Sequence, residues 1–197
     1  MTGIIILAAG QSGRMGTPKQ QLQFKGTSLL QHAIATAASA DAEIVLVVLG
    51  FQAGALWPQA VSRKVSVVVN ENWQEGMASS IRTGMENLIA QKPLVQNVII
   101  MLCDQPFVTA ELLNGLIQKK AATNNGIIAC SYAGTVGVPA LFGRLYFEYL
   151  TALKGETGAK KILQQFAADV STIDFNGGAI DIDTPADFEK LSAGAIN

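Results

Sequence analysis

Residue types suited to binding phosphate follow the first apolar run of the chain. Residues 4–9 are apolar, the loop after them begins at Gly10 and contains mostly small residues, and Arg14 and Lys19 lie within it. Small side chains let backbone N–H groups approach a ligand, and successive N–H groups form an anion-binding concavity. The guanidinium of Arg14 and the ammonium of Lys19 can pair with phosphate oxygens. Neither the dinucleotide-binding pattern nor the P-loop pattern is present. The alternative to a phosphate-binding loop is a Gly-rich turn with two surface cations.

Two acidic segments could supply a metal site. Asp104 directly follows the apolar run 98–103, and Pro106 then stops the strand. Asp181 and Asp183 are two residues apart, so they share a face if that segment is extended. Mg²⁺ prefers one or two protein carboxylates and completes its octahedron with water and phosphate oxygens. The alternative is that these acids serve in turns or as helix caps.

A loop-to-helix junction in residues 70–84 is a third candidate. Gly76 allows a sharp turn or the close approach of a ligand, and Ser79 or Ser80 could cap the helix that follows. The N-terminus of a helix has free N–H groups and a positive dipole end, which favour an anion. The alternative is an ordinary capped junction, with Trp73 as a packing residue close to it.

Alternation of apolar runs with helical patterns predicts the elements that position these residues. We expect strands at residues 4–7, 43–49, 65–69, 98–103, 127–131, 138–142 and 170–175, and helices at 28–40, 80–89, 110–122, 145–153, 158–167 and 185–192. Residues 53–64 are expected to be a polar loop that breaks at Pro58. The pattern predicts a three-layer α/β/α fold with a mostly parallel sheet and a small mixed extension in the second half. The phosphate loop and Asp104 then face one crevice, where the strands end.

Composition limits the function classes. The 197 residues are 49% hydrophobic and 15% charged, which suits one domain over residues 1–197. A net charge of −1 with scattered Lys and Arg argues against nucleic-acid binding. Apolar stretches stay below the roughly 18 residues of a membrane span, and residues 1–3 lead directly into a strand, so we expect a cytoplasmic protein. Cys103 and Cys130 lie in apolar runs and are expected to be buried free thiols.

The loop Leu7-Ala8-Ala9-Gly10-x-Ser12-x-Arg14-Met15-Gly16-x-x-Lys19 resembles the signature loop of the MobA-like nucleotidyltransferases, the branch that acts in molybdenum-cofactor synthesis. The resemblance recurs over nearly the whole chain, at segments 76–84, 103–106, 137–139, 155–160 and 181–185. It implies a Rossmann-like fold and a site that binds a nucleoside triphosphate with Mg²⁺. The nucleotide-binding residues that it implies are Leu7, Ala8, Ala9, Gly10, Ser12, Gly13, Arg14, Lys19, Gly76, Ser79 and Ser80. Arg14, Lys19 and Asp104 are implied to be catalytic, and Asp104 and Asp183 to hold the metal.

The resemblance also implies the reaction. A phosphate oxygen of the acceptor attacks the α-phosphorus and pyrophosphate leaves; a phosphate nucleophile is already ionised, so no general base is required. Cytidylyl relatives carry Ala-Ala-Gly, as at Ala8–Gly10 here, and guanylyl relatives carry Ala-Gly-Gly. CTP and molybdopterin are therefore the expected substrates, and a molybdoenzyme is a candidate partner. Glu156 and Lys160 replace the Asp and Arg of the family on the acceptor side.

Three alternatives stay open, and the sequence argues against a fourth. The nucleotide could be GTP, and the acceptor could be another small phosphorylated molecule. From a different class, the chain could be an accessory protein that binds nucleotide or cofactor without catalysis. A dinucleotide-dependent oxidoreductase would need an acid after the second strand to bind ribose, and that strand ends at Leu49-Gly50 without one.

Overall fold

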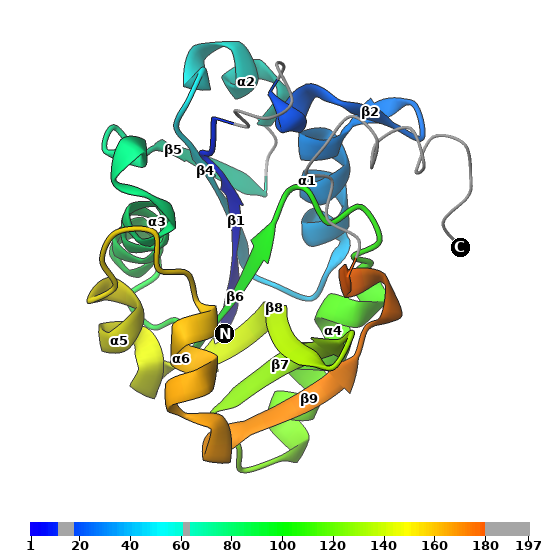
Figure 1. Ribbon diagram of the computed structural model, residues 1–197, viewed down its shortest axis with the longest axis vertical. Coiled ribbons are helices and arrows are strands. Elements are labelled where there is room, and N and C mark those ends of the chain that lie inside the picture. The colour runs from blue at the N-terminus through cyan, green and yellow to red at the C-terminus, as the bar shows by residue number, and fades with distance from the viewer. Residues whose placement is uncertain (12–17, 61–63, 180–197) are drawn as a thin grey trace.

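A seven-stranded sheet forms the middle layer of the molecule, with helices on both of its faces (Figure 1). The computed structural model describes residues 1–11, 18–60 and 64–179. Along the sheet the order is β5-β4-β1-β6-β8-β7-β9, and among the described strands of this sheet β8 is the one that runs antiparallel to its neighbours. The strands are β1 (Thr2–Ala8), β4 (Ile44–Leu49), β5 (Val65–Val69), β6 (Asn97–Leu102), β7 (Ile127–Tyr132), β8 (Thr135–Gly143) and β9 (Val170–Asp174), with a separate hairpin of β2 (Gln23–Phe24) and β3 (Thr27–Ser28).

Two groups of helices cover the sheet. One face carries α1 (Leu29–Ser39), α2 (Ala53–Ala60) and α4 (Ala110–Ala122), and the other carries α3 (Met77–Gln91), α5 (Phe147–Thr151) and α6 (Lys160–Gln165). Short 3-10 turns connect them: η1 (Lys19–Gln21), η2 (Trp73–Glu75), η3 (Arg144–Tyr146), η4 (Ala167–Asp169) and η5 (Asn176–Ala179). The predicted three-layer fold, with its mixed extension in the second half, is confirmed.

Burial on both faces explains why the strands are continuously apolar. In β1, Ile4, Ile6 and Ala8 pack under α1 and α4, whereas Ile5 and Leu7 pack under α3. Side chains alternate along a strand, so a central parallel strand needs apolar residues at every position. Packing on both faces therefore holds the carboxyl end of β1, where the chain leaves the sheet; this end is called the exit of β1 below.

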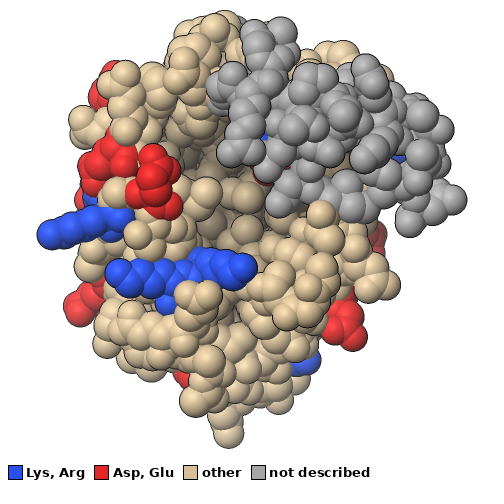
Figure 2. Space-filling view, in the orientation of Figure 1, with Lys and Arg blue, Asp and Glu red and all other residues tan. Residues whose placement is uncertain are grey.

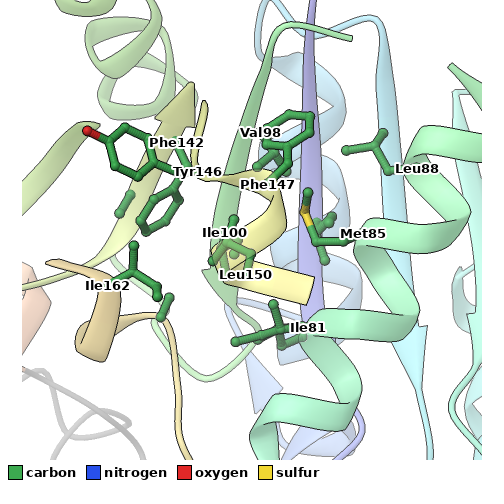
Figure 3. Close-up of a cluster of buried hydrophobic side chains, with 14 of the residues drawn as sticks. Ile81, Met85, Leu88, Val98, Ile100, Phe142, Tyr146, Phe147, Leu150 and Ile162 are labelled. Atoms are coloured by element: carbon green, nitrogen blue, oxygen red, sulfur yellow. The ribbon is translucent and has the colours of Figure 1, made fainter. Parts of the chain in front are cut away.

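The face of the sheet under α3 is packed with buried apolar side chains. Ile81, Met85 and Leu88 of α3 project toward Val98 and Ile100 of β6 (Figure 3). All five are buried, with at most 1% exposed. Burying one such side chain contributes about 1.5–3 kcal/mol relative to leaving it exposed. This packing holds the end of β6 and the start of α3 in a fixed relation.

The chain connections place a crevice between β1 and β6. From β1 the chain passes through α1 to β4 and on to β5, which lie on one side of β1. From β5 it passes through α3 and returns on the other side, to β6. The connections thus diverge between β1 and β6, and open α/β sheets bind ligands where they diverge, beyond the carboxyl ends of the strands.

Several local predictions are confirmed. The strand 65–69 and the helix 110–122 have their predicted bounds, and Thr109 Oγ1 caps that helix by accepting from Leu112 N. Cys103 and Cys130 are buried free thiols, and burial raises the pKa of Cys130 to about 12. No helix in the described part of the chain combines the length and apolarity that a membrane span needs.

Two predictions about helices are wrong. Residues 53–60 form α2 rather than a loop, because Leu56 is fully buried against the core and this packing outweighs the break expected at Pro58. The helix predicted at 80–89 begins three residues earlier, at Met77. The predicted helix 185–192 lies outside the described residues.

Candidate active site

A cleft of about 530 Å³ opens where β1 and β6 end. Figure 2 shows this face of the molecule hollowed near its middle. The volume is within the range of small-molecule sites. The lining residues come from five separate segments of the chain: Leu7, Ala8, Ala9, Gly10, Gln11, Lys19, Gln20, Trp73, Gln74, Gly76, Met77, Ser80, Leu102, Cys103, Asp104 and Glu156.

An ion pair joins two of the predicted catalytic residues in this cleft. Lys19, in η1 after the β1 loop, places its Nζ 3.4 Å from Oδ2 of Asp104, which follows β6. Their side chains are 16% and 20% exposed, so the pair is screened less than a surface ion pair. The structure thus brings the predicted phosphate-binding cation and the predicted metal-binding acid to one place, although 85 residues separate them.

The backbone at the exit of β1 is fixed by contacts from two sides. Gln20 Nε2 donates to the carbonyl oxygens of Ala8 and Gly10, both at 2.9 Å. On the other side, Phe51 N donates to the carbonyl oxygen of Ala9. Gly50 permits this approach, because a Cβ there would lie 2.8 Å from the Ala9 Cβ. Sequence reasoning missed Gln20; a buried amide beside Lys19 has no pattern that marks it.

Gly76 is the N-cap of α3 and has φ +111°. Its backbone lies so close to the loop after α5 that a Cβ would be 2.7 Å from the carbonyl oxygen of Gly155. Ala78 N donates to that same oxygen, and Ser79 N donates to the Gly76 carbonyl oxygen. The start of α3 therefore uses these N–H groups within the protein, instead of leaving them free for an anion as the sequence suggested.

The two serines of this junction have different places. Ser79 and Ser80 do not cap α3, which corrects the prediction, because the helix already begins before them. Asn70 Nδ2 donates to the Oγ atoms of Ser79 and Ser80, at 2.8 and 3.0 Å. Ser79 Oγ also lies 2.8 Å from the Gly76 carbonyl oxygen, so it supports the loop from behind. Ser80 lines the cleft, and its hydroxyl proton can be donated to a ligand.

Arg82 connects the start of α3 to the loop that follows α5. Its Nη1 donates to the carbonyl oxygen of Leu153 at 2.7 Å, and its Nη2 donates to Oε2 of Glu75 at 2.6 Å. The hydrogen bond from Arg82, aided by one from the Gly155 backbone, lowers the pKa of Glu75. Glu156 of this loop lines the cleft. Arg82 thus attaches the loop after α5, which the family resemblance places on the acceptor side, to the start of α3, which the resemblance places on the nucleotide side.

Most predicted site residues gather in the cleft. Leu7, Ala8, Ala9, Gly10, Lys19, Gly76, Ser80 and Asp104 line it, and Ser79 lies behind it. The predicted residues Ser12, Gly13, Arg14 and Asp183 lie outside the described residues. Within the described ranges, no three His, Cys, Asp or Glu side chains form a metal-binding group.

Comparison with known proteins defines the class. The MobA-like NTP transferase domain matches residues 4–170. The chain is 30% identical to the purine catabolism protein PucB of Bacillus subtilis, over 95% of this chain and 94% of PucB. It is 27% identical to nicotine blue oxidoreductase of Paenarthrobacter nicotinovorans, over 97% and 96% of the two chains.

A solved structure agrees with these matches. Rv0371c of Mycobacterium tuberculosis superposes with a TM-score of 0.84 at 31% identity, covering 96% of both chains. That protein also has a solved complex with manganese. The chain belongs to the MobA-like NTP transferase family, and it is a nucleotidyltransferase by family and by fold. The resemblance read from the sequence is confirmed.

Proposed function

We propose that this protein transfers CMP from CTP to the phosphate of molybdopterin, with Mg²⁺ as cofactor and pyrophosphate as the other product. The observation that carries the proposal is the Lys19–Asp104 pair, which lies in one cleft with the backbone of Ala8–Gly10. A cation, a carboxylate and exposed backbone are what a triphosphate and its metal require. In this proposal residues 1–197 act as one catalytic unit, and a molybdoenzyme receives the product.

The nucleotide would bind over the exit of β1. Backbone N–H groups of residues 9–11, with Ser12, Gly13 and Arg14, would surround the phosphates, and the Ser80 hydroxyl would bind the nucleoside. Ala9 supports CTP over GTP, because its methyl group narrows the space beside Trp73. Gly50 packs directly against both residues, since a Cβ at Gly50 would be 2.7 Å from the Trp73 Cβ and 2.8 Å from the Ala9 Cβ. Neither residue can therefore move back to make room for a purine base.

A divalent cation fits the donor set of the cleft. Asp104 offers a shielded carboxylate, a hard oxygen ligand of the kind Mg²⁺ takes. Gln20 lines the same cleft and has a buried amide oxygen that can accept a hydrogen bond from a water on the ion. Asp104 and Asp183 would hold the ion. When bound, it neutralises charge on the phosphates. The manganese complex of Rv0371c supports divalent-metal binding in this fold.

Catalysis then consists of positioning and charge stabilisation. An oxygen of the acceptor's phosphate forms a bond to the α-phosphorus, the bond from that phosphorus to the bridging oxygen breaks, and pyrophosphate carries away the electron pair. Lys19 and Arg14 stabilise the negative charge that develops. The cleft needs no general base, because the attacking oxygen is already ionised at neutral pH.

The acceptor would bind near the loop 153–158. Glu156 of this loop lines the cleft, and Lys154 and Lys160 beside it are exposed. Figure 2 shows Lys and Arg side chains below and to the left of the hollow, with Asp and Glu side chains above them, and an anionic acceptor would favour the basic part of this rim. A pterin phosphate is the favoured acceptor, with another small phosphorylated molecule as the alternative.

Pyrophosphate release tests the proposal. We expect release that requires Mg²⁺, CTP and molybdopterin together, with a lower rate when GTP replaces CTP. Nucleotide binding without release would instead indicate an accessory protein. The name of one relative, nicotine blue oxidoreductase, suggests an oxidoreductase, but β4 ends at Leu49–Gly50 without an acid for ribose. We therefore expect no consumption of nicotinamide cofactors.

A further inference from the structure

The amide of Gln20 is held so that its oxygen has no partner in the described part of the protein. Gln20 is 3% exposed and lines the cleft beside Lys19. Both hydrogens of its Nε2 are used, one toward the carbonyl oxygen of Ala8 and one toward that of Gly10. These two acceptors fix which end of the amide is nitrogen. Its Oε1 is buried, and no described residue donates to it; an unpaired buried oxygen is unfavourable, so it marks a place for a ligand's hydrogen.

The same amide sets the direction of two backbone N–H groups. In a trans peptide the C=O and N–H point in opposite directions. Because the carbonyls of Ala8 and Gly10 point to Gln20, the N–H groups of Ala9 and Gln11 point away from it. Neither N–H donates to a backbone carbonyl of the described residues, and both residues line the cleft. Gln20 therefore orients two donors that an anion can use.

We propose that Gln20 is a positioning residue for the nucleotide and an acceptor for its metal complex. Nε2 fixes the exit of β1, and Oε1 accepts a hydrogen bond from a water molecule bound to the divalent cation. This inference rests on the proposed function. Phosphate oxygens have no hydrogen to donate at neutral pH, whereas Mg²⁺ retains several waters. Gln20 and Asp104 line the same cleft, and Lys19, the residue before Gln20, places its Nζ 3.4 Å from Asp104 Oδ2.

Three variants separate the two roles. Gln20→Met removes both the donor and the acceptor at nearly constant length. Gln20→Glu keeps an acceptor oxygen but cannot donate to the two carbonyls when ionised. Gln21→Met is the matched control, since Gln21 is the next residue of the same 3-10 turn and does not line the cleft. Circular dichroism and thermal unfolding verify that each variant is folded.

Binding is measured with a non-hydrolysable CTP analogue, so that turnover plays no part. Calorimetry in EDTA gives the affinity for the analogue alone, and electron paramagnetic resonance of free Mn²⁺ gives the metal affinity of the protein–analogue complex. We expect both Gln20 variants to bind the analogue about tenfold more weakly in EDTA, as loss of a hydrogen-bonding group implies. Mn²⁺ affinity falls about fivefold in Gln20→Met only, as loss of one hydrogen bond implies, and Gln21→Met matches the wild type in both measurements.

Each part of this proposal is overturned by a different outcome. Wild-type affinity for the analogue in Gln20→Met would overturn the positioning role. Equal loss of Mn²⁺ affinity in Gln20→Met and Gln20→Glu would overturn the acceptor role. A wild-type protein that binds neither the analogue nor Mn²⁺ would overturn the proposed function itself, and this inference with it.

Discussion

The variant Gly76→Ala is expected to destabilise the protein and to weaken nucleotide binding. At φ +111° and ψ −171° the backbone of Gly76 is in a region that only glycine occupies readily, and forcing another residue there costs about 1–3 kcal/mol. The added Cβ would also lie 2.7 Å from the Gly155 carbonyl oxygen, and overlap with backbone adds about 1–3 kcal/mol. We therefore expect a loss of about 3 kcal/mol in the free energy of unfolding. For a chain of this size that lowers Tm by about 6–12 °C.

Thermal unfolding and CTP titration check this prediction together. Gly54→Ala is the matched control, because a Cβ at Gly54 in α2 meets nothing within 4 Å; it should leave Tm unchanged or raise it slightly. CTP affinity should fall in Gly76→Ala and stay unchanged in Gly54→Ala. A Gly76→Ala protein with the Tm and CTP affinity of the wild type would show that the contact between this turn and Gly155 does not shape the cleft.

Two further predictions concern the surroundings of the cleft. Arg82→Met removes the charge-assisted hydrogen bond to the Leu153 carbonyl, which contributes about 1.5–3 kcal/mol. Steady-state kinetics should then show that KM for the acceptor rises more than KM for CTP. Equal rises of the two KM values would refute a link between Arg82 and the acceptor loop. Burial of Tyr146, aided by its hydrogen bond to Asp169, raises the pKa of Tyr146 to about 12. The folded state therefore keeps a proton that the unfolded state loses above a pH of about 10. Stability should fall as pH rises from about 10 to about 12, less steeply in Tyr146→Phe, and equal slopes in the two proteins would contradict this.

The sheet and part of the site were predictable because both follow from local sequence. Ile4–Leu7 and Val98–Cys103 are apolar at every position, which indicates strands covered on both faces. In a parallel sheet such strands end at one edge, so the meeting of Lys19 with Asp104 could be expected. This geometric inference did not depend on the family resemblance.

The remaining features depend on contacts between distant segments. Helix α2 forms although it contains Pro58, because Leu56 finds a buried place against α1. The start of α3 is set by the loop at Gly155, far along the chain. The place of Gln20 in the cleft depends on its hydrogen bonds to the carbonyl oxygens of Ala8 and Gly10. Spacing within a single sequence carries no signal for such pairings.

Transfer of label from CTP tests the central claim most directly. With CTP labelled at the α-phosphate, Mg²⁺ and molybdopterin, we expect the label in the pterin product; with CTP labelled at the γ-phosphate, we expect it in pyrophosphate. Asp104→Asn should slow this transfer at least about a hundredfold, while Asp41→Asn, at the opposite edge of the sheet before β4, should not. Transfer at the wild-type rate by Asp104→Asn, or γ-label in the pterin product, would contradict the account.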